Sequence, residues 1–120
     1  MKQTVTIHCI VEKAHLASTM KSGSLDVLAT PQMIAWMEQA ACLCLDLEEG
    51  QTSVGIAMNV SHDAPSPLGA EITIQATLTE QKGRILQYDV VAYQGQTCIG
   101  KGKHTRCIVN SEKFLAKVYQ

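Results

Sequence analysis

The sequence of 120 residues has few aromatic side chains and no surplus of either charge. One Trp, three Tyr and one Phe are too few for the stacking platform that single-stranded nucleic acids bind. Ten Lys and Arg against eleven Asp and Glu leave no basic excess for a phosphate backbone, so we expect no nucleic-acid binding. No apolar run approaches the roughly 18–20 residues that cross a bilayer, and residues 1–4 do not begin a signal peptide. These features predict a cytoplasmic protein without a membrane partner.

The cysteines do not indicate a disulfide framework or a metal site. They form an odd set without C-x-x-C spacing, so we expect reduced, mostly buried thiols: Cys9, Cys42, Cys44, Cys98 and Cys107. Cys42 and Cys44 would point apart on a helix, and we therefore predict no metal. With 46% hydrophobic residues, the chain can fill one aliphatic core, and we interpret residues 1–120 as a single domain.

Alternation of polar and apolar residues predicts five strands. They cover residues 4–11, 53–62, 71–78, 85–93 and 97–109, and the breaks at 82–84 and 94–96 predict hairpins. In the second strand, Val54, Ile56, Met58, Val60 and His62 should share the inner face, with Ser53 and Gly55 on the other. Residues 12–29 show no clean period and predict a long loop, and residues 111–120 predict a short helix.

Thr30-Pro31 predicts the start of a helix, because threonine suits the N-cap and proline suits the first helical position. The helix should end at Gly50, and its segment 33–45 is apolar on nearly every side, which is typical of a helix surrounded by protein. One helix and five strands predict an α+β domain whose antiparallel sheet curls around the helix, with Gly100 and Gly102 as bend points. The free edges and outer face favour a dimer.

Glu38 is the most informative residue, because a carboxylate inside an apolar helix costs several kcal/mol unless it is paired or hydrogen-bonded. Its alternative interpretation is a polar stripe with Gln39 that faces solvent or a dimer partner. His62 should point toward the same layer, where it and Glu38 could act in acid–base or nucleophilic catalysis. The alternative for His62 is a structural histidine that caps the following loop.

Thr30 is either an ordinary N-cap or a group that helps to hold an oxyanion at the helix N-terminus. It lies about 12 Å along the helix from Glu38, so substrate and His62, a second subunit or a later helix start must connect them. Gly55 marks a bulge or a close approach to the backbone. Arg106 forms a basic cluster with Lys101 and Lys103, which is either a solvated face or a site for the phosphates of a nucleotide-bearing ligand.

Other candidate residues carry weaker signals. Cys42 lies one turn after Glu38 and is a rival nucleophile, but a thiol in apolar surroundings is inert. The remaining histidines have no mutual spacing, and we assign them surface or structural roles: His8, His15 and His104.

Four stretches, in order, resemble the fluoroacetyl-CoA thioesterase-type branch of the hotdog superfamily: residues 27–31 with 37–40, then 52–55, 60–69 and 99–106. The resemblance implies a hotdog fold and a homodimer with sites near its interface, and hydrolysis of an acyl-CoA thioester without metal or redox cofactor. The family's catalytic threonine, glutamate and histidine fall on Thr30, Glu38 and His62, and its close-approach glycine falls on Gly55. Residues 12–29 contain none of the lid phenylalanines of the family's best-known member, so we expect another acyl group than fluoroacetyl.

The leading hypothesis is therefore an acyl-CoA thioesterase with a Thr30, Glu38 and His62 site, in which Gly55 and Arg106 contact the substrate. The main alternative is a non-catalytic hotdog module that binds acyl-CoA or another small ligand. An interaction domain that only builds an oligomer and a hydratase of the same superfamily are weaker alternatives.

Overall fold

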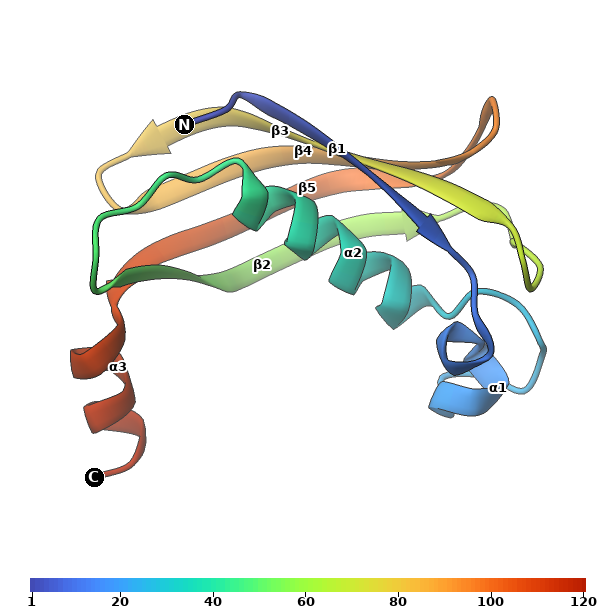
Figure 1. Ribbon diagram of the computed structural model, residues 1–120, viewed down its shortest axis with the longest axis horizontal. Helices are drawn as coiled ribbons and strands as arrows, with labels where there is room; N and C mark the ends of the chain where they lie inside the picture. The colour runs from blue at the N-terminus through green and yellow to red at the C-terminus, as the bar shows by residue number, and fades with distance from the viewer.

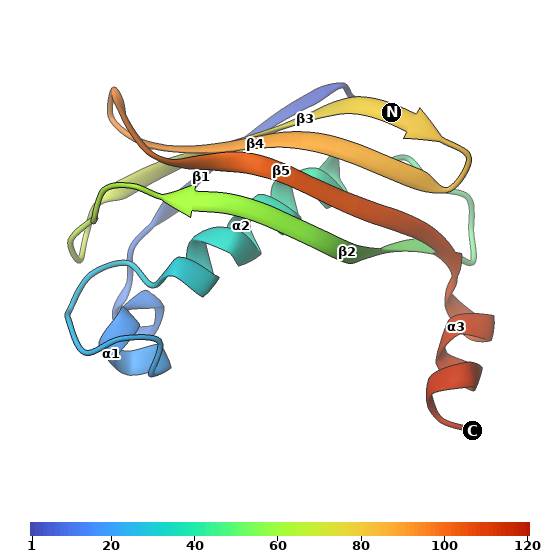
Figure 2. The same cartoon turned by 180° about the vertical axis from the view of Figure 1, so that it is seen from behind.

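A long helix lies against the inner face of a curved antiparallel sheet in the computed structural model, which describes residues 1–120 (Figure 1). The strand order is β1-β3-β4-β5-β2, so β1 and β2 are the two free edges. Seen from behind, the outer face of the sheet carries no helix, and the C-terminal helix projects away from the end of β5 (Figure 2). None of the helices has the length and hydrophobicity of a membrane-spanning segment. The elements are β1 (Thr4–Ile10), η1 (Lys13–His15), α1 (Ala17–Met20), α2 (Thr30–Leu43), β2 (Gln51–His62), β3 (Glu71–Lys82), β4 (Ile85–Gln94), β5 (Thr97–Asn110) and α3 (Ser111–Val118).

The core lies between α2 and the sheet. The buried residues of α2 recur at helical spacing, which turns one face toward β3 and β4: Met33, Trp36, Met37, Ala40 and Ala41. The sheet contributes Ile72, Ile74 and Ala76 of β3 and Leu86, Tyr88 and Val90 of β4. Each large aliphatic side chain buried here stabilises the fold by about 1.5–3 kcal/mol.

The helix α2 is shorter than the apolar pattern predicts. It ends at Leu43, whereas the expectation was an end near Gly50. In a longer helix, the carbonyl of Cys44 would accept a hydrogen bond from the N–H four residues later. Here it accepts one from the backbone N–H of Lys2 at 2.9 Å. The N-terminal segment thus satisfies a carbonyl just beyond the end of the helix, and the acidic residues that follow lie in a connection to β2.

Most strand predictions are confirmed. The inward alternation of β3 leaves Ile72, Ile74 and Ala76 without solvent exposure. The hairpins turn at Gly83 and Gly95, which have φ values of 61° and 59°, a conformation that suits glycine. Residues 12–29 are not one irregular loop, because η1 and α1 form within them and Leu16 pairs with Leu28 next to the start of α2.

The strand β2 changes its inward face part-way along. Gly55 pairs with Arg106 and Ala57 with Thr105, so Ile56 is the additional residue of a β-bulge. Beyond the bulge, Met58, Val60 and His62 are half-buried, as expected. Before it the expectation is wrong: Ser53 and Gly55 turn toward the helix, and Ile56 is 55% exposed.

The glycines of β5 serve close packing with β2 and α2. A Cβ at Gly100 would lie 2.6 Å from the Ser61 carbonyl oxygen and 2.7 Å from Met33 Sδ. At Gly102 it would lie 2.1 Å from the Asn59 carbonyl oxygen, which belongs to the backbone of the neighbouring strand.

The Gly102→Ala substitution should therefore destabilise the fold by about 1–3 kcal/mol or more, because β2 and β5 would have to separate. Urea denaturation of this variant measures the loss. The control is Lys101→Ala, which changes an exposed side chain of the same strand and should shift stability by no more than ~0.5 kcal/mol. Equal stability of Gly102→Ala and wild type would contradict the packing described above.

Candidate active site

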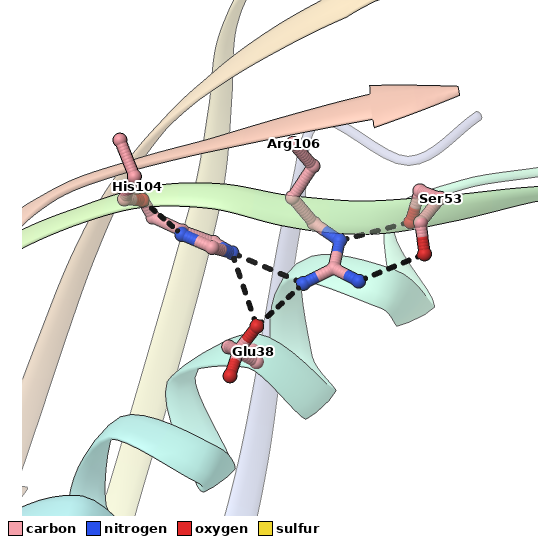
Figure 3. Close-up of polar contacts among 5 residues, drawn as sticks. Glu38, Ser53, His104 and Arg106 are labelled. Atoms are coloured by element: carbon pink, nitrogen blue, oxygen red, sulfur yellow. Dashed lines mark hydrogen bonds and ion pairs between the residues drawn. The ribbon is translucent and has the colours of Figure 1, made fainter. Parts of the chain in front are cut away.

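Glu38 lies on the side of α2 that faces β2, and its side chain is 41% exposed. Its Oε2 atom accepts a hydrogen bond from Arg106 Nη1 at 2.9 Å and lies 4.0 Å from His104 Nε2 (Figure 3). The expectation that this carboxylate is paired or hydrogen-bonded is confirmed. The alternative is correct in part, because the side chain is partly exposed and lies next to the exposed Gln39.

Arg106 is the buried cation of the site. The alternation of β5 turns it toward the helix, where it is 6% exposed. In addition to Glu38, it donates from Nε to Ser53 Oγ at 2.9 Å and from Nη2 to the Ser53 carbonyl at 3.0 Å. The expected basic cluster with Lys101 and Lys103 does not form, because both lysines are exposed on the opposite face of the strand.

His104 also belongs to this group of side chains, although the sequence interpretation left it out. It is 2% exposed, and its ring stacks on Tyr88 with centroids 5.8 Å apart. Burial is the main cause that lowers its pKa; Arg106 lowers the pKa further, whereas a hydrogen bond to Ala57 and the charge of Glu38 raise it. The sequence did contain a signal for its position: His104 is two residues from both Gly102 and Arg106 on β5, so all three lie on the same face of the strand.

Gly55 lies directly over this group of side chains. A Cβ there would be 2.5 Å from Glu38 Oε2 and 3.3 Å from both Arg106 Nη1 and His104 Cε1. The two interpretations of Gly55, a bulge and a close approach, are therefore both confirmed. Beside it opens a shallow hollow of about 290 Å³, lined by Glu38, Gly55, Ile56, Ala57, Met58 and His104.

Thr30 and His62 form a second polar pair. Thr30 is the first residue of α2 and Ala29 occupies the N-cap position, so the N-cap interpretation of Thr30 is wrong. Its hydroxyl lies 2.7 Å from His62 Nδ1. Burial lowers the pKa of His62, against smaller raising effects of the Asp63 charge and a backbone hydrogen bond at Ala64. A lowered pKa favours the neutral imidazole, which is the form that can accept a proton.

The two groups do not meet within one chain. Thr30 and His62 line a hollow of about 270 Å³ that also includes Ala17, Val27, Leu28, Ala64 and Pro65, whereas Glu38 lines the hollow at Gly55. The expectation that His62 reaches the cavity of Glu38 is therefore wrong for the single chain, in which His104 is the imidazole nearest to Glu38. Cys42 is exposed, and no group of three or more His, Cys, Asp or Glu side chains is arranged to hold a metal.

Similarity to known proteins assigns the chain to a family. The model of the fluoroacetyl-CoA-specific thioesterase family, FlK, matches residues 11–112. The chain belongs to this family. It is 40% identical over 97 residues to the fluoroacetyl-CoA thioesterase of Streptantibioticus cattleyicolor. The aligned region covers 79% of this chain and 70% of that protein.

One further sequence relative and one solved structure also resemble this FlK-family protein. Acyl-coenzyme A thioesterase 13 of Mus musculus is 30% identical over 103 residues, or 83% of this chain and 69% of that one. A solved structure of the fluoroacetyl-CoA thioesterase FlK matches with a TM-score of 0.94 at 32% identity and covers 100% of this chain and 95% of its own. Together with the strand order, this match establishes the expected α+β hotdog fold.

The lowered pKa values of His62 and His104 predict that acid weakens the fold. Because both pKa values lie below the ordinary value of about 6.5, the unfolded chain binds more protons than the folded one as pH falls below that value. Stability should therefore decrease between pH 7 and 5, by at most ~1.4 kcal/mol per pH unit for each histidine.

Urea denaturation at several pH values tests this prediction on the wild type and on His104→Gln. The variant cannot titrate at position 104, so it should lose less stability than the wild type between pH 7 and 5. The same pH slope in both proteins would show that His104 is not held neutral by the fold.

Proposed function

We propose that this FlK-family protein hydrolyses a small acyl-CoA thioester to the free acid and CoA. The observation that carries the proposal is the position of the Glu38 carboxylate. Arg106 holds it at the edge of the hollow beside Gly55, and any side chain at position 55 would displace it. Supporting it are the thioesterase names of the family and of two curated relatives.

The proposed catalytic residues are Glu38, His62 and Thr30. Glu38 either attacks the thioester carbonyl carbon or removes a proton from the water that attacks it. The carbonyl oxygen then carries negative charge, which the Thr30 hydroxyl and the backbone N–H groups at the start of α2 stabilise. The C–S bond breaks and CoA leaves as thiolate. The proton that the attacking water loses passes through His62 to this thiolate. Where Glu38 is the nucleophile, that water hydrolyses the acyl-enzyme anhydride, releases the free acid and restores the carboxylate.

Of the two residues expected to contact the substrate, we assign that contact to Gly55 and give Arg106 the role of holding the reacting carboxylate beside it. Gly55 has no side chain, so an acyl group can approach the carboxylate of Glu38 along the backbone of β2. Arg106 contributes the positive charge next to the reacting carboxylate, rather than a surface site for phosphates. We place the acyl group in the hollow near Thr30, against its small apolar side chains: Ala17, Val27, Leu28, Ala64 and Pro65. Ser22 and Asp63 line the rest of that hollow, beside Thr30 and His62. No aromatic residue lies in 12–29, which favours a short aliphatic acyl group over fluoroacetyl.

A homodimer would unite the two separate hollows. Both lie along β2, the free edge strand, which exposes the apolar Ile56. Antiparallel pairing of two β2 strands about a twofold axis near the middle of the strand would bring the end that carries His62 close to the Gly55 region of the partner subunit. Each site would then combine Thr30 and His62 of one protomer with Glu38 of the other. We place this dimer in the cytoplasm, because five free thiols suit a reducing compartment.

Glu38→Gln and His62→Ala should each lower kcat at least ~100-fold, because each removes a group that transfers protons or attacks the substrate. The assay uses acetyl-, propionyl-, butyryl- and fluoroacetyl-CoA with a thiol reagent. Cys42→Ala, one turn along the same helix, is the matched control and should keep wild-type activity. Full activity of both test variants would reject the site, and saturable binding of CoA esters without thiol release would instead support the binding module.

Mixed dimers test how the site is divided between protomers. Neither Glu38→Gln nor His62→Ala alone should be active, but a heterodimer of the two variants has one site with all wild-type residues. Co-refolding equal amounts should therefore restore about one quarter of the wild-type rate, since half of the dimers are mixed and each has one intact site of two. No recovery in a mixture shown by mass spectrometry to contain heterodimers would place all three residues in one chain.

A further inference from the structure

The guanidinium of Arg106 has more acceptors than its ion pair with Glu38 requires. Its Nη1 atom donates to Glu38 Oε2 at 2.9 Å and also faces His104 Nε2 at 3.2 Å, while Ser53 accepts from Nε and Nη2 (Figure 3). Four acceptor atoms on α2, β2 and β5 thus surround one cation that is 6% exposed.

The other ring nitrogen of His104 defines its tautomer. Nδ1 lies 2.8 Å from the carbonyl oxygen of Ala57, which can only accept, so Nδ1 carries the hydrogen. In a neutral ring Nε2 is then an acceptor that points at Arg106. Three titratable groups face the ring. Arg106 on the same strand repels a second proton, Glu38 on α2, 4.0 Å away, attracts one, and Tyr88 on β4 stacks on the ring. Burial, which lowers the pKa of His104, acts in the same direction as Arg106.

Glu38 cannot stay charged throughout the proposed reaction. As a general base it gains a proton, and as a nucleophile its oxygen forms a bond to the acyl carbon; in both cases the carboxylate loses its negative charge. A buried guanidinium that depended on this carboxylate alone would then lose its partner and be free to rotate.

We propose that His104 is a positioning residue whose Nε2 holds Arg106 in place while Glu38 is neutral. Together with Ser53 it keeps the guanidinium oriented, so that the carboxylate finds the same partner when its charge returns. The inference rests on the proposed thioesterase function and adds a residue that acts through Arg106 and touches no substrate.

Two substitutions of His104 separate the acceptor from the ring. His104→Phe keeps an aromatic ring against Tyr88 but has no acceptor, and His104→Gln keeps an amide oxygen near the position of Nε2. We expect kcat of the Phe variant to fall roughly 10- to 100-fold with KM unchanged, and that of the Gln variant to stay within about threefold of wild type. The control His8→Phe changes an exposed histidine of β1 and should leave both constants unchanged. Equal loss of kcat in the Phe and Gln variants would overturn the role of the acceptor.

A second measurement does not depend on turnover. In Glu38→Gln, which mimics the neutral acid, ¹⁵N NMR should still resolve separate Nη signals for Arg106, because Ser53 and His104 prevent rotation of the guanidinium. In the double variant Glu38→Gln/His104→Phe these signals should merge into one. Resolved signals in the double variant would overturn the proposal. If the wild type hydrolyses no CoA ester, the proposed function fails, whereas the NMR comparison still decides whether His104 holds Arg106.

Discussion

The hydrogen-bonded ion pair of Glu38 and Arg106 is the contact on which the geometry of this site depends. A guanidinium that is 6% exposed requires a counter-charge and acceptors for its remaining hydrogens. Glu38 is the counter-charge, and Ser53 of β2 provides two of the acceptors. Ser53 and Gly55 must both face the helix for this purpose, the first as acceptor and the second to make room for the carboxylate. The chemistry of one buried cation therefore determines which residue types can occupy the first half of β2.

The bulge at Ile56 reconciles that requirement with the rest of the strand. Without the additional residue, a strand that turns Ser53 and Gly55 inward would turn Met58, Val60 and His62 outward. With it, Ser53 at one end of the strand bonds Arg106, the partner of the Glu38 carboxylate. At the other end, His62 lies within hydrogen-bond distance of Thr30. The same residue places an apolar side chain on the free edge, where the proposed dimer would bury it.

Sequence periodicity predicted the strands and both hairpins, because these follow from local alternation and turn chemistry. It predicted a helix surrounded by protein, whereas one side of α2 is exposed, including Ala35, Gln39 and Leu43. It predicted Glu38 and Gly55 as well, since a carboxylate in an apolar helix and a glycine in a strand each violate a local rule. Just beyond the end of α2, the carbonyl of Cys44 bonds Lys2, which is distant in sequence. The inward face of Ser53 depends on a one-residue bulge without a sequence signal. In the sequence, Arg106 resembled part of a basic surface because Lys101 and Lys103 lie nearby. Its partners, Glu38 and Ser53, are distant in sequence, so local patterns could not reveal them.

The number of acceptors around position 106 also explains why the cation is an arginine. The guanidinium reaches Ser53 Oγ, the Ser53 carbonyl, Glu38 and His104 from three nitrogen atoms in one plane. A lysine ammonium has three donors on a single atom, so it could not bond four acceptors that belong to three different elements. The planar fork instead links α2, β2 and β5 through one side chain. The position of the Glu38 carboxylate is therefore set by the sheet as a whole and not by the rotamer of one residue on the helix.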